Sequence, residues 1–197
     1  TPALARAPAA APAAIPLGKL SDAARPTAYR LDLTVDPTQT RFTGHTEIDT
    51  QVARPTRTLY LHGNGLNVTR VAATIGTRKI TARYTQVDPS GVARLDFDGD
   101  LPAGRVTLAF DYDAPFMTGG EGLYRTRVGD RWYAWTQFEP IDARRMFPSF
   151  DEPGFKTPFT LSITAPTTQR VFANTPEVAH GTSGGGLTVH TFAPSRP

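Results

Sequence analysis

The chain has 197 residues, no cysteine and a formal net charge of +3, from 21 Lys and Arg against 18 Asp and Glu. This length fits one domain with a sizeable core, and the lack of cysteine excludes disulfides and zinc sites built on thiolates. The basic residues are dispersed, and no apolar run approaches the roughly 20 residues that span a bilayer, so neither a nucleic-acid partner nor a membrane span is expected.

The N-terminal segment is rich in Ala and Pro and begins "TPALARAPAAAPAAIP". Repeated prolines prevent a stable helix, so we predict a flexible tail over residues 1–20 and a β domain over residues 21–197. The segment has no apolar core like that of a signal peptide. It is similar to the start of a mature exported protein, which favours a periplasmic or secreted location over a cytoplasmic one.

Alternation of apolar and polar residues with a period of two dominates the sequence after the tail. In "YRLDLTV", residues 29–35, the apolar residues would share one face, as in a half-buried strand. Similar runs follow at close spacing in the ranges 42–52, 58–62, 66–75, 79–87, 92–97, 105–112, 121–127, 131–138, 159–165, 170–174 and 187–192. About a dozen short strands predict an all-β fold, either a sandwich or an open barrel.

Glycine and proline mark where these strands should turn. "DPSG" at residues 88–91 is typical of a type I turn, and the glycine in residues 128–130 predicts a hairpin. A short helical turn is expected only within residues 141–147, since Pro148 disfavours helical backbone at the residue before it. A strand pattern follows the glycine-rich residues 181–186, so we interpret these as a flexible hairpin loop rather than a phosphate-binding loop.

The motifs of the common hydrolases do not predict an active site in this sequence. The histidines are His45, His62, His180 and His190. None of them has a second histidine at the spacing of H-E-x-x-H. We interpret the four as unrelated and expect no catalytic metal site in this chain. The letters of G-x-S-x-G occur at residues 181–185, but a strand pattern rather than a helix follows them, so we expect no elbow that presents a serine nucleophile.

The densest cluster of charged residues lies in "TQFEPIDARRMFPSFDEPGFK", residues 136–156. Gln137 and Glu139 stand two apart at the end of a predicted strand, where a period of two would turn both side chains to the same face. A carboxylate can accept hydrogen bonds from an ammonium group, and an amide can bond to a neighbouring carbonyl. The pair therefore fits either a ligand-binding site or a solvent-facing polar strand end.

Two bases and two acids follow in the same segment, namely Arg144, Arg145, Asp151 and Glu152. Pro148 lies between the bases and the acids, and Pro153 follows the acids. The prolines stiffen the segment and so lower the entropic cost of fixing it. We interpret the four charged residues as structural ion pairs that tie this turn to the sheet.

Several blocks of the sequence resemble the N-terminal domain of the gluzincin aminopeptidases, the aminopeptidase N family of zinc metallopeptidases. They are "GLYRTR", "WTQFEPIDARRMFPSFDEPGFKTPFTLSI" and "VFANTP", with "YRLDLTVD" and "FTGHTEI" before them and "TVHTFAPSRP" after. The resemblance runs from about Ala28 to the C-terminus, in the family's order and spacing. One departure is Ser149, where many relatives have Cys, at a position that is not part of the chemistry.

The resemblance implies a saddle-shaped, mainly antiparallel β domain that caps the active site of a larger zinc aminopeptidase. The family's catalytic motifs, G-A-M-E-N and H-E-x-x-H with a distant zinc-binding Glu, do not occur in this sequence. We therefore expect this chain to hold no catalytic residue and no cofactor and to be inactive alone, with zinc held elsewhere in the full-length enzyme.

The resemblance also implies roles for the two residues at the strand end. Glu139 would help to anchor the free N-terminal amine of a peptide substrate, and Gln137 would line the first side-chain pocket. The expected partners are peptide N-termini and the enzyme's own catalytic domain, which would cover part of an apolar face. That face would include Trp132, Tyr133, Trp135 and Phe138.

A stand-alone β-sandwich module that binds carbohydrate or protein is an alternative from a different functional class. It would use the same all-β fold without any catalytic domain. An H-E-x-x-H segment in the downstream coding sequence would favour the aminopeptidase, and a stop codon after Pro197 would favour the module.

Overall fold

The structure is a computed structural model that describes residues 14–197, and its regular structure is almost entirely strand. The elements are β1 (Ala24–Thr34), β2 (Arg41–Val52), β3 (Thr56–His62), β4 (Asn67–Ile75), β5 (Arg78–Gln86), β6 (Val92–Leu101), β7 (Gly104–Pro115), β8 (Gly122–Val128), β9 (Arg131–Gln137), the 3-10 helix η1 (Ala143–Arg145), β10 (Phe159–Pro166), β11 (Glu177–Gly184) and β12 (Leu187–Phe192). The predicted all-β fold with one short helical turn is confirmed. Within the described part of the chain, no helix has the length and apolar character needed to cross a membrane.

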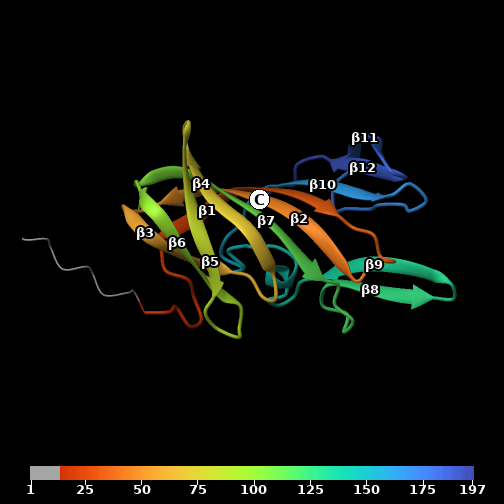
Figure 1. Cartoon of the computed structure of the whole chain (residues 1–197), viewed down its shortest axis with the longest axis horizontal. Coiled ribbons are helices and arrows are strands. Elements are labelled where there is room, and N and C mark those ends of the chain that lie inside the picture. The colour runs from red at the N-terminus through yellow and green to blue at the C-terminus, as the bar shows by residue number, and fades with distance from the viewer. Residues whose placement is uncertain (1–13) are drawn as a thin grey trace, which may run out of the picture.

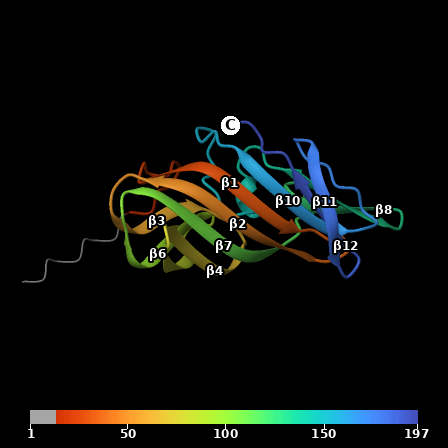
Figure 2. The same ribbon diagram turned by 90° about the horizontal axis from the view of Figure 1, so that it is seen from above.

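Ten strands build one large sheet, in the order β11-β12-β10-β1-β2-β7-β4-β5-β6-β3. Neighbours pair antiparallel except β1 and β10, which run parallel, so the sheet is mixed and does not close into a barrel. Figures 1 and 2 show a long twisted layer with β3 to β6 at one end and β10 to β12 at the other. The remaining strands, β8 and β9, form a separate hairpin that projects below β10 to β12 in Figure 1.

The core lies against one face of the sheet because side chains alternate strictly along its central strands. Exposed or half-buried residues alternate with buried ones along β2 and β7, and the buried set includes Ile48, Leu108 and Phe110. Burying one such side chain contributes roughly 1.5–3 kcal/mol. Gly44 is required on this face, since a Cβ atom there would lie 2.4 Å from the ring of Tyr112 on the neighbouring strand.

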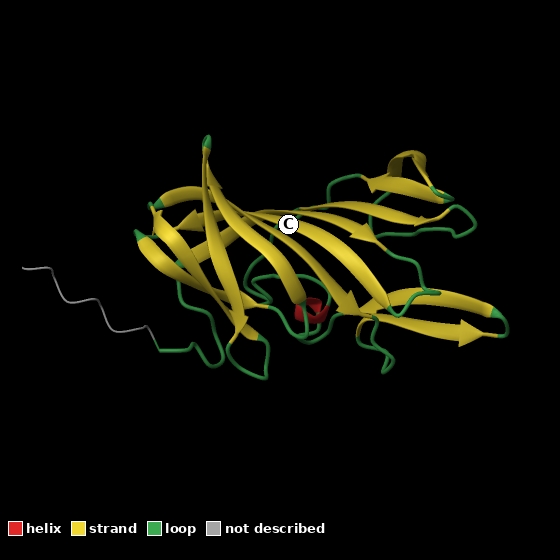
Figure 3. Ribbon diagram, viewed as in Figure 1, coloured by secondary structure: helices red, strands yellow, loops and turns green. Residues whose placement is uncertain are grey.

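The parallel pair of β1 and β10 returns the chain to the sheet after the β8–β9 hairpin. It places Phe159 beside Tyr29, with the two rings stacked at 4.6 Å, and Phe147 packs edge-on against both at 6.1 Å. The charged segment of residues 136–156 is therefore the connection between the hairpin and the sheet. Figure 3 shows its short helix η1 below the strands of the large sheet.

The structure corrects the prediction near the C-terminus. Residues 170–174, predicted as a strand, form none, and β11 follows them instead. All eight residues of β11 are exposed, so no alternation of apolar and polar residues marks it. Pairing with β12 holds it in place. The predicted flexible loop at 181–186 consequently shrinks to the two glycines at 185–186. Together with Gly184 at the end of β11, they have φ angles of 79°, 60° and 76°, which suit glycine.

The predicted tail, residues 1–20, lies mostly outside the described residues. At its C-terminal end, Leu20 is buried, and its backbone N–H donates a hydrogen bond to the carboxylate of Glu152 at 2.5 Å. Glu152, within the charged segment, thus holds the chain just before β1 begins.

Candidate functional site

Gln137 and Glu139 stand at the exposed start of the charged segment. Gln137 is the last residue of β9 and pairs with Gly122 at the base of the hairpin. The strand ends there, so its alternation does not extend to Glu139, which is also exposed. Among residues 14–197, no ion pair involves Glu139. Its carboxylate is therefore available to a cation from outside the domain.

A tight turn anchors the chain immediately after this exposed pair. Phe138 packs edge-on against Phe147 at 6.1 Å, and the backbone N–H of Asp142 donates to the carbonyl oxygen of Phe138 at 2.8 Å. The Asp142 carboxylate accepts a hydrogen bond from Arg145 Nε at 2.7 Å, and Arg145 also lies 3.9 Å from Glu121. Arg145 thus holds this turn rather than pairing with Asp151 or Glu152.

Arg144 is the buried centre of the segment, with 6% of its surface exposed. Its Nε donates to the Asp151 carboxylate at 2.8 Å and its Nη2 to the Asp151 carbonyl at 3.1 Å. Its Nη1 donates to the Ser90 carbonyl at 2.9 Å, while its own carbonyl accepts the Asn64 N–H at 2.7 Å. One guanidinium therefore binds the segment to the β5–β6 turn, and the same residue's backbone binds it to the β3–β4 turn.

His62, at the end of β3, lies beneath the same segment and is 1% exposed. Its backbone exchanges hydrogen bonds with Ser149, and its Nδ1 accepts the Asp151 N–H at 3.1 Å. Nδ1 must therefore carry no proton. Burial first, and the positive charge of Arg144 second, lower the pKa of His62 to about 4. The ring is neutral at pH 7 and acts as a structural acceptor.

No group of three or more histidine, aspartate or glutamate side chains within residues 14–197 is arranged to hold a metal ion. Two of the histidines are nonetheless neighbours, although the sequence predicted four unrelated ones. His180 and His190 face each other across β11 and β12, and both lie near the carboxylate of Glu177, at 3.2 and 3.0 Å. Only the position of β11, which shows no periodicity, could have revealed this contact.

An apolar groove of about 950 Å³ runs between the β8–β9 hairpin and the β10 end of the sheet. Trp132, Tyr133 and Trp135 line its hairpin side, and Val171 and Phe172 line the opposite side. Phe172 is 82% exposed and Trp135 is 56% exposed, which is unusual for side chains of this size. Phe138, expected at the same edge, packs inward instead.

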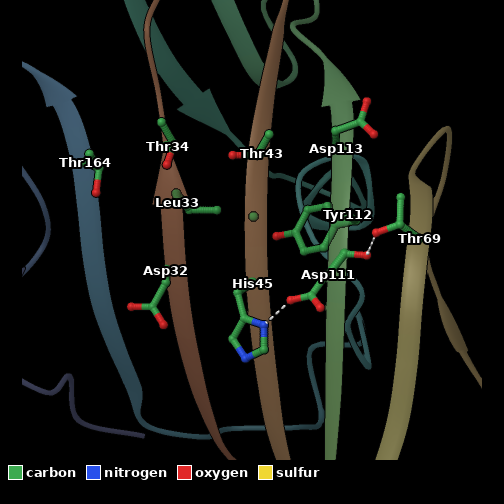
Figure 4. A pocket seen from close by; sticks show the side chains of 11 residues that line it. Asp32, Leu33, Thr34, Thr43, His45, Thr69, Asp111, Tyr112, Asp113 and Thr164 are labelled. Carbon is green, nitrogen blue, oxygen red and sulfur yellow. Dashed lines mark hydrogen bonds and ion pairs between the residues drawn. The ribbon is translucent and has the colours of Figure 1, made fainter. Parts of the chain in front are cut away.

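A second, polar pocket of about 450 Å³ lies on the outer face of the large sheet (Figure 4). Figure 4 shows Asp32, His45 and Asp111 side by side on β1, β2 and β7, with His45 Nδ1 at 2.5 Å from Asp111. Burial alone would raise the pKa of Asp111, but hydrogen bonds from His45 and Arg70 outweigh it, and that pKa is lowered. Two acids of this pocket are thus already engaged by bases of the same sheet, Asp111 by His45 and Arg70 and Asp113 by Arg41.

Comparison with known proteins gives one consistent family. The family model described as "Peptidase M1 N-terminal domain" matches residues 25–197. The chain is 33% identical over 171 residues to Aminopeptidase M1-C of Oryza sativa subsp. japonica. It is 32% identical over 164 residues to Aminopeptidase N of Acetobacter pasteurianus, and 29% identical over 179 residues to Endoplasmic reticulum aminopeptidase 1 of Rattus norvegicus.

These relatives are much longer than the part that matches. The alignments cover 85%, 81% and 86% of this chain but only 19%, 45% and 19% of the three relatives, in the same order. The chain therefore corresponds to a fraction of each relative.

We predict that Arg144→Ala lowers the free energy of unfolding by about 3–5 kcal/mol, because it leaves the Asp151 carboxylate buried without its partner. Urea unfolding measures the change. The control is Arg145→Ala, whose side chain is 31% exposed, and its loss should be about 1 kcal/mol. Equal losses for the two variants would contradict the central position given to Arg144.

We also predict a pH dependence of stability that comes from His62. In the unfolded state His62 has its ordinary pKa of about 6.5, whereas in the folded state its pKa is about 4, so stability falls as the pH drops through this window. The full loss is about 3 kcal/mol. His62→Asn keeps an acceptor for the Asp151 N–H and should flatten the dependence between pH 6.5 and 4.5.

The control for this measurement is His180→Asn, since the side chain of His180 is 71% exposed. That variant should keep the pH dependence of the unmodified chain in the same unfolding experiments. A His62→Asn variant that keeps the dependence would show that other groups cause it.

Proposed function

The chain belongs to the M1 peptidase family as its N-terminal domain, and on that premise we propose that it is the non-catalytic wall of a zinc aminopeptidase. In this proposal it caps the active site and helps to bind the free N-terminal amine of peptide substrates. The observation that carries the proposal is the exposed, unpaired carboxylate of Glu139 beside Gln137, at the edge of a rigid segment. The match of the family over residues 25–197 supports it.

The zinc of such an enzyme would have to be held outside this domain. The side chains of residues 14–197 offer no group of ligands that fits a metal ion. Zinc supplies an activated water for peptide hydrolysis when bound. The contribution of this chain is to recognise the substrate and to exclude water from one side of the cleft.

Glu139 would distinguish a free N-terminus from an internal peptide bond. A free N-terminus carries a positive charge, and a fixed carboxylate is the simplest group that detects it. Because no base among the described residues pairs with Glu139, binding an ammonium would not require an internal ion pair to break. Gln137, two residues earlier, would offer its amide to the first residue of the substrate.

The apolar groove supports a partner domain that covers this end of the molecule. Exposed aromatic side chains that gather along one groove usually mark a contact with another protein surface. In the proposed enzyme, the catalytic domain would bury Trp135 and Phe172, which are 56% and 82% exposed here. The interface would place the two domains on either side of Gln137 and Glu139.

The polar pocket of Figure 4 is less suited to the alternative function of a carbohydrate-binding module. Sugar rings bind well when an exposed aromatic face packs against their C–H groups, because an aromatic side chain offers a large apolar surface. The one aromatic residue that lines this pocket is Tyr112, whose side chain is buried on the core side. The pocket therefore offers acids and threonines without a stacking surface.

We predict that Glu139→Gln, in an aminopeptidase that carries this domain, lowers kcat/KM by at least about tenfold for a substrate with a free amine, because a charge-assisted hydrogen bond is worth about 1.5–3 kcal/mol. The melting temperature should change little, since the substitution is nearly isosteric. Asp100→Asn is the control, because that acid is exposed at the far end of β6. Unchanged kinetics for Glu139→Gln would refute the role of amine anchor.

We further predict that the chain of residues 1–197 alone does not hydrolyse an aminoacyl-anilide and binds no stoichiometric zinc. The reason is the absence of a ligand group among its described residues and of an H-E-x-x-H motif in its sequence. Anilide release and metal content of the purified chain measure both. Zinc-dependent turnover that a chelator abolishes would contradict the prediction.

A further inference from the structure

Arg125, on β8, joins the hairpin to a distant turn of the large sheet. Its Nη1 lies 3.2 Å from the carbonyl oxygens of both Pro37 and Thr38, and it also donates to the carbonyl oxygen of Gln39. Its guanidinium carbon lies 4.4 Å above the ring centre of Trp132 on β9, which fits a cation–π contact. One side chain thus contacts both strands of the hairpin and the β1–β2 turn.

The β1–β2 turn is organised to present these carbonyl groups. The Asp36 carboxylate accepts hydrogen bonds from the backbone N–H and the hydroxyl of Thr38, at 2.9 and 2.7 Å. The N–H of Gln39 donates to the Asp36 carbonyl at 3.0 Å. The carbonyl groups of residues 37–39 are therefore fixed in place before the guanidinium binds them.

The hairpin has few other attachments to the body of the domain. It is a two-stranded sheet of its own, and its backbone is bonded to Met117 at the base through Leu123 and Arg125. Within residues 14–197, every side-chain hydrogen bond that leaves the hairpin comes from Arg125. Residues 126–131 at its tip are exposed.

The orientation of the hairpin also sets the position of Gln137. The β8–β9 ladder runs without interruption from Val128 opposite Arg131 to Gly122 opposite Gln137. Because Gln137 pairs with Gly122 at the base, a rotation of the hairpin there would turn the end of β9 and change the direction in which the chain enters the following segment. Binding groups that are misplaced by about 1 Å lose much of their effect.

We propose that Arg125 is a positioning residue that fixes the β8–β9 hairpin on the β1–β2 turn and thereby sets the place of Gln137 and Glu139. The expected effect of Arg125 on substrate binding rests on the proposed function, whereas its effect on the hairpin does not. Arg125 itself touches no substrate in this proposal. It acts through the carbonyl groups of residues 37–39 and the ring of Trp132.

Hydrogen exchange of the chain itself tests the effect on the hairpin. Arg125→Ala should speed exchange of the β8–β9 backbone amides by about tenfold or more, with β2 and β7 unchanged, because opening becomes local. The matched control is Arg127→Ala, on the same strand, since the bonded partner of Arg127 is Asp130 at the exposed tip. Asp36→Ala, which loosens the turn without changing the hairpin, should give the same local pattern as Arg125→Ala.

Kinetics of an aminopeptidase that carries this domain test the effect on the site. Arg125→Ala should raise KM by about fivefold or more with kcat within about twofold, because the amine is held in the ground state and the transition state alike. Arg125→Lys keeps a cation near the carbonyl groups and should restore part of the loss. Arg127→Ala should leave both constants unchanged.

The outcomes separate this inference from the proposed function. Hairpin exchange that is equal in Arg125→Ala and Arg127→Ala would overturn the inference. So would a normal KM for Arg125→Ala in an enzyme that Glu139→Gln impairs. If Glu139→Gln leaves the kinetics unchanged, the proposed function fails, and faster exchange confined to the hairpin would still support Arg125 as the residue that fixes it.

Discussion

The buried ion pair between Arg144 and Asp151 is the interaction on which the rest of the site depends. Burying a guanidinium costs several kcal/mol unless its donors are satisfied. Here they are bound by the Asp151 carboxylate and by the carbonyl groups of Ser90 and Asp151. The same Asp151 donates its N–H to His62, which stays neutral because burial first, and the positive charge of Arg144 second, disfavour the protonated ring. The pair therefore specifies one arrangement of the segment.

Gln137 and Glu139 lie where this fixed segment meets a projecting hairpin. On the C-terminal side, the turn from Phe138 to Asp142 holds the chain against the core. On the N-terminal side, β9 carries Gln137 and is tied to the sheet through the Arg125 contacts. Two independent sets of contacts thus determine the position of two exposed side chains. Such placement suits groups that must meet a ligand from outside the domain.

Local sequence pattern was enough to predict most of the fold and little of the site. Alternation identified strands such as β2 and β7 because one face of each is buried. It failed for β11, whose residues are all exposed. It also marked residues 170–174 as a strand, although they form none and residues 170–172 line the groove. The Arg125 contacts join residues almost 90 positions apart, and the groove is lined by separate parts of the chain. Only the tertiary structure could reveal either feature. The roles of Gln137 and Glu139 remain a prediction from family resemblance.

Charged residues on the outer face of the sheet differ from Glu139 in that they are paired with one another. On the outer face of the sheet, Arg30 bonds to Glu47 at 2.6 Å and to Asp49 at 2.8 Å, and His45 bonds to Asp111. A ligand there would have to compete with partners already in place, including the bidentate pair of Arg30 and Asp49. Glu139 has no such competitor among the described residues, yet the chain on either side of it is held firmly. A carboxylate that is both unpaired and well positioned can bind a positively charged ligand without first breaking an ion pair. Glu139 meets both conditions, and for this reason the proposed amine site lies there rather than at the larger clusters of charge.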